Sequence, residues 1–266
     1  MVPNQEISLP PPTPSDAGLP KAVSSPAWGI RAAVAAVALA GWFWTQALIG
    51  KRAAISGGIV DRLHLLSEPL HQFLLDHPRS ADGLLVVSSA FIDLFGIFLL
   101  VWGIFGPSVR PLLGLVLLFG LRQLCQWVCA LPPPEGMIWH HPGFPSLLVT
   151  YGVSSDLFFS GHTAVAVLGA IEVGRLGSRW LALAAAVLAL FEASTVLVLR
   201  AHYTLDVFAG AVTALYVAYN SDRLGPLCDR AMARWVSWAL RQGAKKGKGT
   251  PPPPSAVPQR GGEPLR

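Results

Sequence analysis

The sequence predicts an all-α fold, a polytopic membrane bundle of six transmembrane helices with interfacial helices and disordered tails. Of its 266 residues, 52% are hydrophobic and only 13% are charged, whereas soluble proteins average about 25% charged residues. Apolar runs of about 20 residues, long enough to cross a bilayer as a helix, recur along the chain. The net charge of +5 lies mostly in the tails, which indicates contact with an anionic membrane surface rather than with nucleic acid.

The segment 1–27 is rich in proline and has no apolar core of a signal peptide, so we expect a disordered tail. A catalytic transmembrane domain is predicted to follow over 28–222. The six apolar runs in it set the expected spans at about 28–49, 81–105, 109–130, 157–173, 180–199 and 203–220.

The stretch 59–79 is too polar to span a membrane, and Pro69 interrupts it, so we expect a broken amphipathic helix in the interface. Three histidines in this stretch could suggest a metal site: His64, His71 and His77. Because Pro69 prevents one helix face from gathering them, we interpret them as interfacial polar residues. Cys125, Cys129 and Cys228 show no zinc-ligand spacing either, and we expect them to be packing residues.

Two segments complete the predicted domain organisation. Residues 223–242 are basic and carry Trp235 and Trp238, which is typical of a juxtamembrane interfacial helix. Residues 243–266 combine lysines with a proline run and are expected to form a disordered tail.

Charge distribution predicts the orientation of the bundle in the membrane. Basic residues crowd the C-terminal tail, and Arg175 and Arg179 flank the turn between the fourth and fifth spans. The positive-inside rule therefore makes both termini cytosolic and points the loops after the third and fifth spans to the extracytoplasmic face. Lys51 and Arg52 argue against this orientation, because they would lie outside.

A histidine and a carboxylate lie four residues apart where the fifth span gives way to the sixth, in Arg200-Ala201-His202-Tyr203-Thr204-Leu205-Asp206. Residues four apart share one face of a helix, and a titratable pair at the edge of a span is costly enough to imply a function. A second histidine, His162, opens the fourth span on the same side of the membrane.

These residue types suit phosphoryl chemistry. An imidazole held by a carboxylate can attack phosphorus, and a second imidazole can protonate the departing alcohol. Arg122 and Arg200 can hold the phosphate. Ser160 and the helix N-terminus would lie nearby, with Gly161 allowing a close backbone approach. This chemistry requires no metal and no other cofactor.

A simpler interpretation stands beside this one. Interfacial histidines are commonly just polar groups that reach water, and Arg122 could pair with Glu192 or Asp93 to hold the bundle together. Two histidines and a carboxylate at span ends on one side favour catalysis over this interpretation.

At these residues the chain resembles the phosphatidic acid phosphatase type 2 superfamily and, more narrowly, is similar to its sphingomyelin synthase branch over about 115–222. The shared marks include the two histidine motifs and Arg122 followed ten residues later by Pro132. Plant phosphatidylcholine:diacylglycerol cholinephosphotransferases of this branch have an Arg-x-His-Tyr-Thr pattern that matches Arg200. Asp156 matches an aspartate of sphingomyelin synthases.

The resemblance implies His202 as the nucleophile, Asp206 as its orienting partner and His162 as the acid/base, with Asp156 and Tyr203 in support. It also implies the reaction: a phosphocholine or phosphoethanolamine group moves from a glycerophospholipid to a lipid alcohol, ceramide or diacylglycerol. Membrane lipids would then be the partners, and nucleic acid would not.

The plain phosphatase members of the superfamily carry marks that this chain lacks. Gly103 stands where they have a lysine ahead of Arg110, and Phe159 stands where they have a proline. Thr195 and Val196 replace their Ser-Arg pair. Transfer is therefore the leading hypothesis. A lipid phosphatase or phospholipase C-type hydrolase using the same site, and a non-catalytic protein that binds lipid head groups, remain alternatives.

Overall fold

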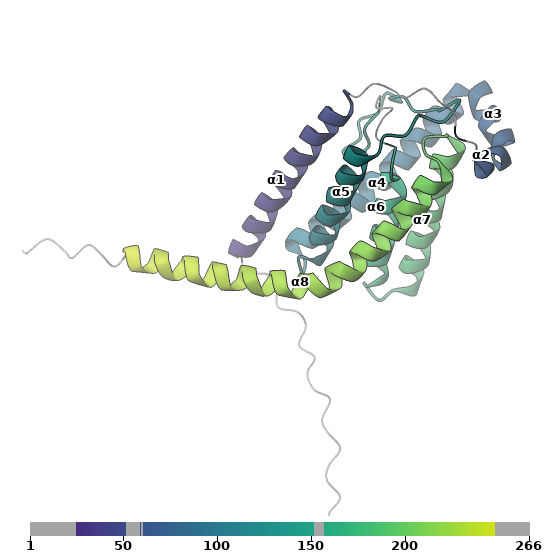
Figure 1. The fold of residues 1–266 in the computed structure, drawn as a ribbon. Coiled ribbons are helices and arrows are strands. Elements are labelled where there is room, and N and C mark those ends of the chain that lie inside the picture. The colour runs from purple at the N-terminus through teal and green to yellow at the C-terminus, as the bar shows by residue number, and fades with distance from the viewer. Residues whose placement is uncertain (1–24, 52–58, 60, 152–156, 248–266) are drawn as a thin grey trace, which may run out of the picture.

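The computed structural model describes residues 25–51, 59, 61–151 and 157–247 (Figure 1), and all the regular structure in these ranges is helical. Eight helices are present there. Their bounds are α1 Ser25–Ile49, α2 Arg62–Leu66, α3 Glu68–Asp76, α4 Pro78–Phe105, α5 Arg110–Val128, α6 Gly161–Gly174, α7 Arg179–Val198 and α8 Thr204–Gly247.

Four of the described helices, α1, α4, α5 and α7, are long and apolar enough to cross a membrane, which makes the chain an integral membrane protein. Helix α6 has only 14 residues, or about 21 Å at 1.5 Å per residue, less than a hydrocarbon core of about 30 Å. The predicted helical membrane bundle is thus confirmed, but with four candidate spans. The predicted count of six and the cytosolic side of the termini stay predictions.

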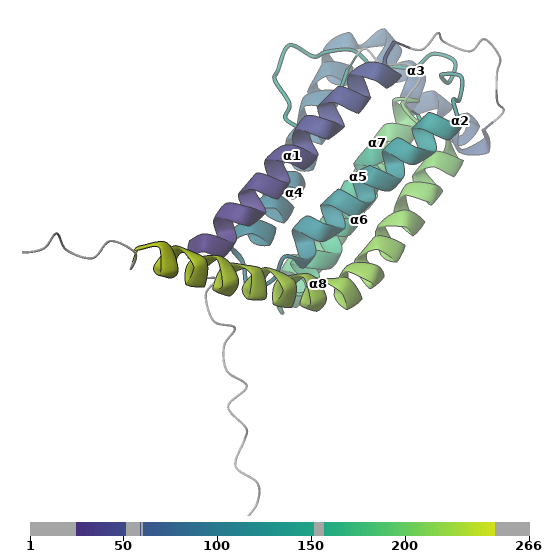
Figure 2. The ribbon, with the colours of Figure 1, turned by 60° about the vertical axis from the view of Figure 1, so that its left-hand side comes forward.

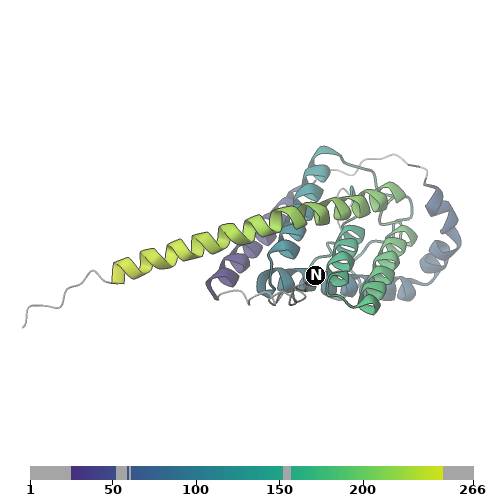
Figure 3. The ribbon, with the colours of Figure 1, turned by 90° about the horizontal axis from the view of Figure 1, so that it is seen from below.

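Helix α8 differs from the sequence-based expectation. A separate interfacial helix was predicted after residue 222, yet α8 continues without a break for 44 residues, with Pro226 inside it. A proline removes one helical hydrogen bond and crowds the preceding turn, which can bend a helix without ending it. Figures 1 and 2 show the bend in α8, and Figure 3 shows its last part extending beyond the bundle.

The stretch before α4, predicted as an amphipathic helix broken at Pro69, forms two short helices that meet at Ser67. Asp61 caps α2 by accepting hydrogen bonds from Leu63 N and His64 N. Helix α3 follows after Ser67 and has Pro69 in its first turn, where a proline is tolerated. Figure 1 shows both helices at one end of the bundle, beside the α7–α8 turn.

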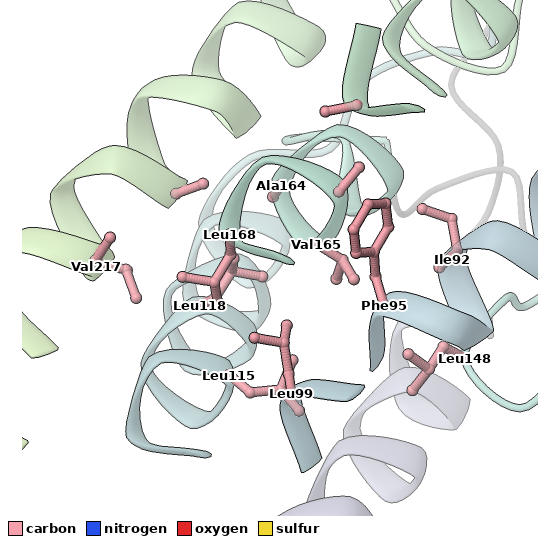
Figure 4. Packing of buried hydrophobic residues seen from close by; sticks show 14 of the residues in the cluster. Ile92, Phe95, Leu99, Leu115, Leu118, Leu148, Ala164, Val165, Leu168 and Val217 are labelled. Atoms are coloured by element: carbon pink, nitrogen blue, oxygen red, sulfur yellow. The ribbon is translucent and has the colours of Figure 1, made fainter. Parts of the chain in front are cut away.

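The core lies where α4, α5, α6 and α8 meet (Figure 4). Leu99, Leu118 and Leu168 have no exposed surface there. Small residues bring the helices close: a Cβ added to Gly169 of α6 would lie 2.3 Å from the Phe95 ring of α4. In the membrane, where lipid tails are as apolar as the core, such close packing holds helices together.

Ion pairs tie the helices at the end of the bundle opposite α2 and α3. Arg31 of α1 binds Asp229 of α8 at 3.0 Å. The buried Glu172 of α6 accepts from both Arg110 and Arg175. Two guanidinium groups around one buried carboxylate compensate the cost of removing it from water, so this end is fixed while the other end carries the site.

The close approach of α4 and α5 generates a stability prediction. A Cβ added to Gly103 would lie 2.5 Å from both N and Cβ of Leu112. Because backbone atoms cannot rotate away, we expect Gly103→Ala to destabilise the protein by about 1–3 kcal/mol, measured by unfolding in detergent. Gly83→Ala is the matched control on the same helix, since nothing lies within 4 Å of its added Cβ. Equal stability of the two variants would contradict this packing.

Candidate active site

The predicted catalytic residues meet in a pocket at the α2–α3 end of the bundle, between α5, α6 and the α7–α8 turn. Arg122, Gly161, His162 and His202 all line this pocket, whose volume is about 40 Å³. The convergence predicted for these four residues is therefore present. Aromatic and apolar side chains complete the wall, among them Trp42, Phe119, Trp139, Leu148, Val149 and Leu157.

His202 lines the pocket, and Asp206 is buried behind it. The side chain of His202 is 7% exposed and that of Asp206 0%. Nδ1 of His202 lies 3.7 Å from Oδ2 of Asp206, slightly beyond hydrogen-bond distance, and has no hydrogen-bond partner among the described residues. Oδ2 already accepts from Tyr203 N at 2.9 Å. The carboxylate is thus fixed, and a small rotation of the imidazole closes the pair, as is common when a substrate is absent.

A helix C-cap sets the position of His202. Helix α7 ends in a Schellman motif, in which Ala201 N bonds Val196 O at 2.9 Å and Arg200 N bonds Leu197 O at 3.0 Å. Arg200 has the left-handed φ of 53° that this motif requires and that glycine usually supplies. The chain therefore turns sharply from α7 into α8, and His202 faces the pocket from within the turn.

The side chain of Arg200 points to a different place from the one predicted. Its guanidinium donates to the Glu68 carboxylate of α3 and, at 2.9 Å, to the carbonyl of Glu135. Arg200 does not line the pocket, so the structure does not bring it to the predicted phosphate site. Its observed bonds instead clamp the α7–α8 turn to α3 and, through Glu135, to the loop that follows α5.

Helices α2 and α3 brace this same turn. His64 Nε2 lies 2.9 Å from the carbonyl oxygen of His202, and His71 Nδ1 lies 2.8 Å from that of Val198. Both imidazoles are buried. The interpretation of His64 and His71 as interfacial polar residues stays a prediction, but it did not include these bonds to backbone carbonyls of α7 and of the turn after it. His77 remains exposed.

Asp61 caps two helices at once. Besides capping α2, it accepts from N and Oγ1 of Thr204, each at 2.6 Å, at the start of α8. Burial alone would raise the pKa of Asp61, but the hydrogen bonds from Thr204 and Leu63 outweigh it, so the pKa lies below its usual value. The carboxylate stays ionised and complements the positive end of α8.

The first turn of α6 is positioned by backbone contact with α8. Ser160 caps α6, its hydroxyl accepting from Thr163 N at 3.3 Å, and Ser160 N donates to Asp206 O at 3.0 Å. Gly210 permits this approach, since a Cβ there would lie 2.6 Å from Ser160 O. His162 is thereby held across the pocket from His202. Its Nε2 is buried without a hydrogen-bond partner in the described chain.

Arg122 lies against the same turn. Its side chain is buried, and Nε donates to the carbonyl of Phe159 at 3.1 Å. A Cβ on Gly161 would lie 3.0 Å from this Nε. The absent side chain of Gly161 thus makes room for Arg122, in addition to the role predicted from sequence.

Asp93, which sequence reasoning offered as a partner for Arg122, anchors a wall of the pocket. Its carboxylate accepts from Ser146 Oγ and from the backbone N of Leu147 and Leu148, at 2.8–3.0 Å. These bonds hold Leu148 against α4, and its side chain lines the pocket. Glu192, the other suggested partner, accepts from Ser88.

Two further predicted site residues, Ser160 and Tyr203, lie outside the pocket. Ser160 is fully buried in its capping role, and Tyr203 stacks on His64 with ring centroids 5.7 Å apart. Neither lines the pocket. Asp156 lies outside the described residues.

Sequence reasoning missed the three aromatic residues of the pocket wall, Trp42, Phe119 and Trp139. Trp139 packs edge-on against His162 with centroids 5.2 Å apart, and its Nε1 bonds Thr150 O at 3.1 Å. Trp42 reaches the pocket from α1. Tryptophan is common in membrane proteins near the interface, so composition alone did not single the two tryptophans out.

The pocket is small for a lipid head group. At about 10–15 Å³ for each water, it holds about three waters. A phosphocholine group is larger, so its entry requires side chains of the wall to move.

The brace generates a pH prediction. Burial lowers the pKa of His71, and the charge of nearby Arg200 acts in the same direction. Below about pH 6.5 the unfolded chain then binds more protons at this residue than the folded protein, so stability falls as the pH drops. His71→Asn cannot titrate, and we expect its unfolding midpoint to change less than that of the wild type between pH 7.5 and 5.5. Identical pH dependence of the two proteins would exclude this role of His71.

Comparison with known proteins agrees with part of the predicted resemblance. The AtPDCT1/2 family matches residues 60–223, which include all the residues of the site except Trp42. Phosphatidylcholine:diacylglycerol cholinephosphotransferase 1 of Arabidopsis thaliana is 23% identical over 146 residues, 55% of this chain and 47% of that protein. The chain thus spans about half the length of this curated relative. No solved structure matches. The chain belongs to the AtPDCT1/2 family.

Proposed function

We propose that this protein transfers phosphocholine or phosphoethanolamine from a glycerophospholipid to a lipid alcohol, diacylglycerol or ceramide, through a phosphohistidine. The observation that carries the proposal is the single pocket that His162, His202 and Arg122 share, with Asp206 buried behind His202. The family match and the similarity to a cholinephosphotransferase support lipid head-group chemistry. The two histidine motifs support a place in the sphingomyelin synthase branch of the phosphatidic acid phosphatase type 2 superfamily.

In the first step His202 attacks the phosphorus of the donor. Asp206 faces Nδ1 of His202 at 3.7 Å. When the imidazole turns to close this pair, the carboxylate holds the proton on Nδ1 and leaves Nε2 to form the P–N bond. The bond from phosphorus to the glycerol oxygen breaks, and His162 gives this oxygen its proton. Arg122 stabilises the negative charge that builds up on the phosphate oxygens. Diacylglycerol leaves, and the head group remains on His202.

The second step reverses the first with another alcohol. His162, now neutral, takes the proton of the acceptor hydroxyl, and the alkoxide oxygen attacks the phosphorus of phosphohistidine. The P–N bond breaks and His202 is restored. Each proton and each bond is balanced over the two steps, so the cycle needs no further reactant.

Hydrolysis is the alternative on the same residues, since water can replace the acceptor alcohol. The aromatic side chains of Trp42, Phe119 and Trp139 in the wall of the pocket favour transfer, because an apolar wall binds water less well than a lipid. A lipid-binding protein without catalysis is less well supported, because His162, His202 and Asp206 are all in place.

Removing the nucleophile tests the proposal. We expect His202→Ala to lower transfer of labelled head group from phosphatidylcholine or phosphatidylethanolamine to diacylglycerol or ceramide by about 10³-fold or more. The assay uses purified protein in lipid vesicles. His77→Ala is the matched control, because His77 is exposed and its Nδ1 bonds only Phe73 O within the same turn.

Three outcomes would count against transfer through His202. Full activity of the variant would end the proposed mechanism. Release of only water-soluble phosphocholine by the wild type would establish hydrolysis instead. Release of inorganic phosphate from phosphatidic acid would establish a lipid phosphatase.

The orienting role of Asp206 predicts a smaller effect. Asp206→Asn keeps the size of the side chain but loses the charge that holds the His202 proton, so we expect the transfer rate to fall about 10- to 100-fold. The loss should be in kcat with KM little changed, because Asp206 lies behind the imidazole. A loss as large as that of His202→Ala would instead make Asp206 part of the reacting set.

A further inference from the structure

A second cavity of about 370 Å³ lies between α1 and α5, and it borders the catalytic pocket. Trp42 of α1 and Phe119 of α5 line both cavities. We propose that this groove, defined by the residues of α1 and α5 that line it, holds one acyl chain of the glycerophospholipid donor. The inference rests on the proposed function, because the donor must bring its phosphate to His202.

The wall of the groove suits a hydrocarbon chain. Alanine, leucine, valine and aromatic side chains dominate it, including Leu39, Leu115 and Val116. The hydroxyl of Thr45 is satisfied by carbonyls of its own helix, and Gln123 Nε2 donates to Gln46 at 3.1 Å. Oε1 of Gln123 is the exception, because it is buried without a hydrogen-bond partner among the described residues. The largely apolar wall therefore suits an apolar occupant.

The groove opens toward the hydrocarbon of the bilayer. Gly41 and Trp44 of α1 and Gly120 of α5 line it and are exposed, and α1 and α5 are both candidate membrane spans. Figures 1 and 2 show the two helices side by side, with α1 at the edge of the bundle. A lipid can thus enter sideways without leaving the membrane.

The order of the two cavities matches the order of groups in a phospholipid. The chain groove is apolar, the catalytic pocket carries Arg122 and the histidines, and Trp42 stands at the junction. The indole Nε1 of Trp42 is buried and has no hydrogen-bond partner among the described residues. An ester carbonyl of the lipid would supply the missing acceptor at this level.

The donor fits better than the acceptor, because only the donor carries a negative phosphate for Arg122. The groove would help the reaction mainly by orienting the donor lipid. A chain in the bilayer is already out of water, so moving it into the groove adds little hydrophobic free energy. Holding the chain fixes the phosphorus beside His202, which raises the rate of attack.

Glycines on the groove provide a sharp test. Nothing lies within 4 Å of a Cβ built on Gly120 or on Gly29, so leucine is tolerated at both positions and raises helix propensity equally. Gly120→Leu places its side chain in the groove. Gly29→Leu is the matched control, because Gly29 lies on α1 outside the groove.

The first measurement reads binding without turnover. Phosphatidylcholine with a photoreactive diazirine in one acyl chain is reconstituted with wild type, His202→Ala, Gly120→Leu and Gly29→Leu. Labelling of the groove peptides is compared with labelling of the lipid-exposed face of α7. We expect excess groove labelling in the wild type, His202→Ala and Gly29→Leu, and its loss in Gly120→Leu. No excess in the wild type, or equal excess in Gly120→Leu, would overturn the proposal.

The second measurement reads the reaction. We expect the ratio of transfer rates for long-chain and short-chain phosphatidylcholine to fall about tenfold in Gly120→Leu and to stay at the wild-type value in Gly29→Leu. An unchanged ratio in Gly120→Leu would contradict the groove while leaving head-group transfer intact. Absence of transfer by the wild type would sink the proposed function, whereas the labelling result would still decide whether the groove binds a chain.

Discussion

The site depends on a backbone contact between the first turns of α6 and α8. Ser160 N donates to Asp206 O at 3.0 Å, and Gly210 lets the backbones of the two helices come this close. These helices begin 43 residues apart in sequence, at Gly161 and Thr204. One hydrogen bond between their first turns is enough to place His162 and His202 around the same pocket. A bond of this kind is buried, so breaking it would leave a donor and an acceptor unpaired at a cost of about 1–3 kcal/mol each.

The hydrogen bonds around this contact limit how far His162 and His202 can move. The α7–α8 turn is closed from within by its helix cap and held from outside by α2 and α3 through His64, His71 and Asp61. The loop over the pocket is seated by Asp93. Catalytic groups gain most when they are rigidly placed before the substrate arrives, because no free energy is then spent on ordering them during the reaction. A polar brace suits this place, since it lies at the end of the bundle where backbone carbonyls of α7 are free.

The sequence predicted which residues meet in the pocket better than it predicted the contacts that support them. The spacing of four predicted that His202 and Asp206 lie together, although His202 precedes α8, which begins at Thr204. The alternating direction of the predicted spans placed Arg122 and His162 at the same end. The brace could not be predicted, because the partners of His64 and His71 are backbone carbonyls, which every residue has. The position of the Arg200 side chain could not be predicted for a related reason. Arg200 has a left-handed backbone conformation, which is rare outside glycine, and its guanidinium bonds Glu68 and Glu135 outside the pocket. The separate helix predicted after residue 222 is absent, because α8 runs through Pro226 without a break.

The central claim is that the head group passes through a covalent bond to His202. p-Nitrophenyl phosphocholine tests it most directly, because nitrophenolate leaves without needing a proton from His162. In His162→Ala, which cannot activate the acceptor, we expect phosphocholine to accumulate on the protein, and mass spectrometry of its peptides should locate it on His202. A label on another residue, or release of nitrophenolate with no protein-bound phosphocholine, would contradict the account.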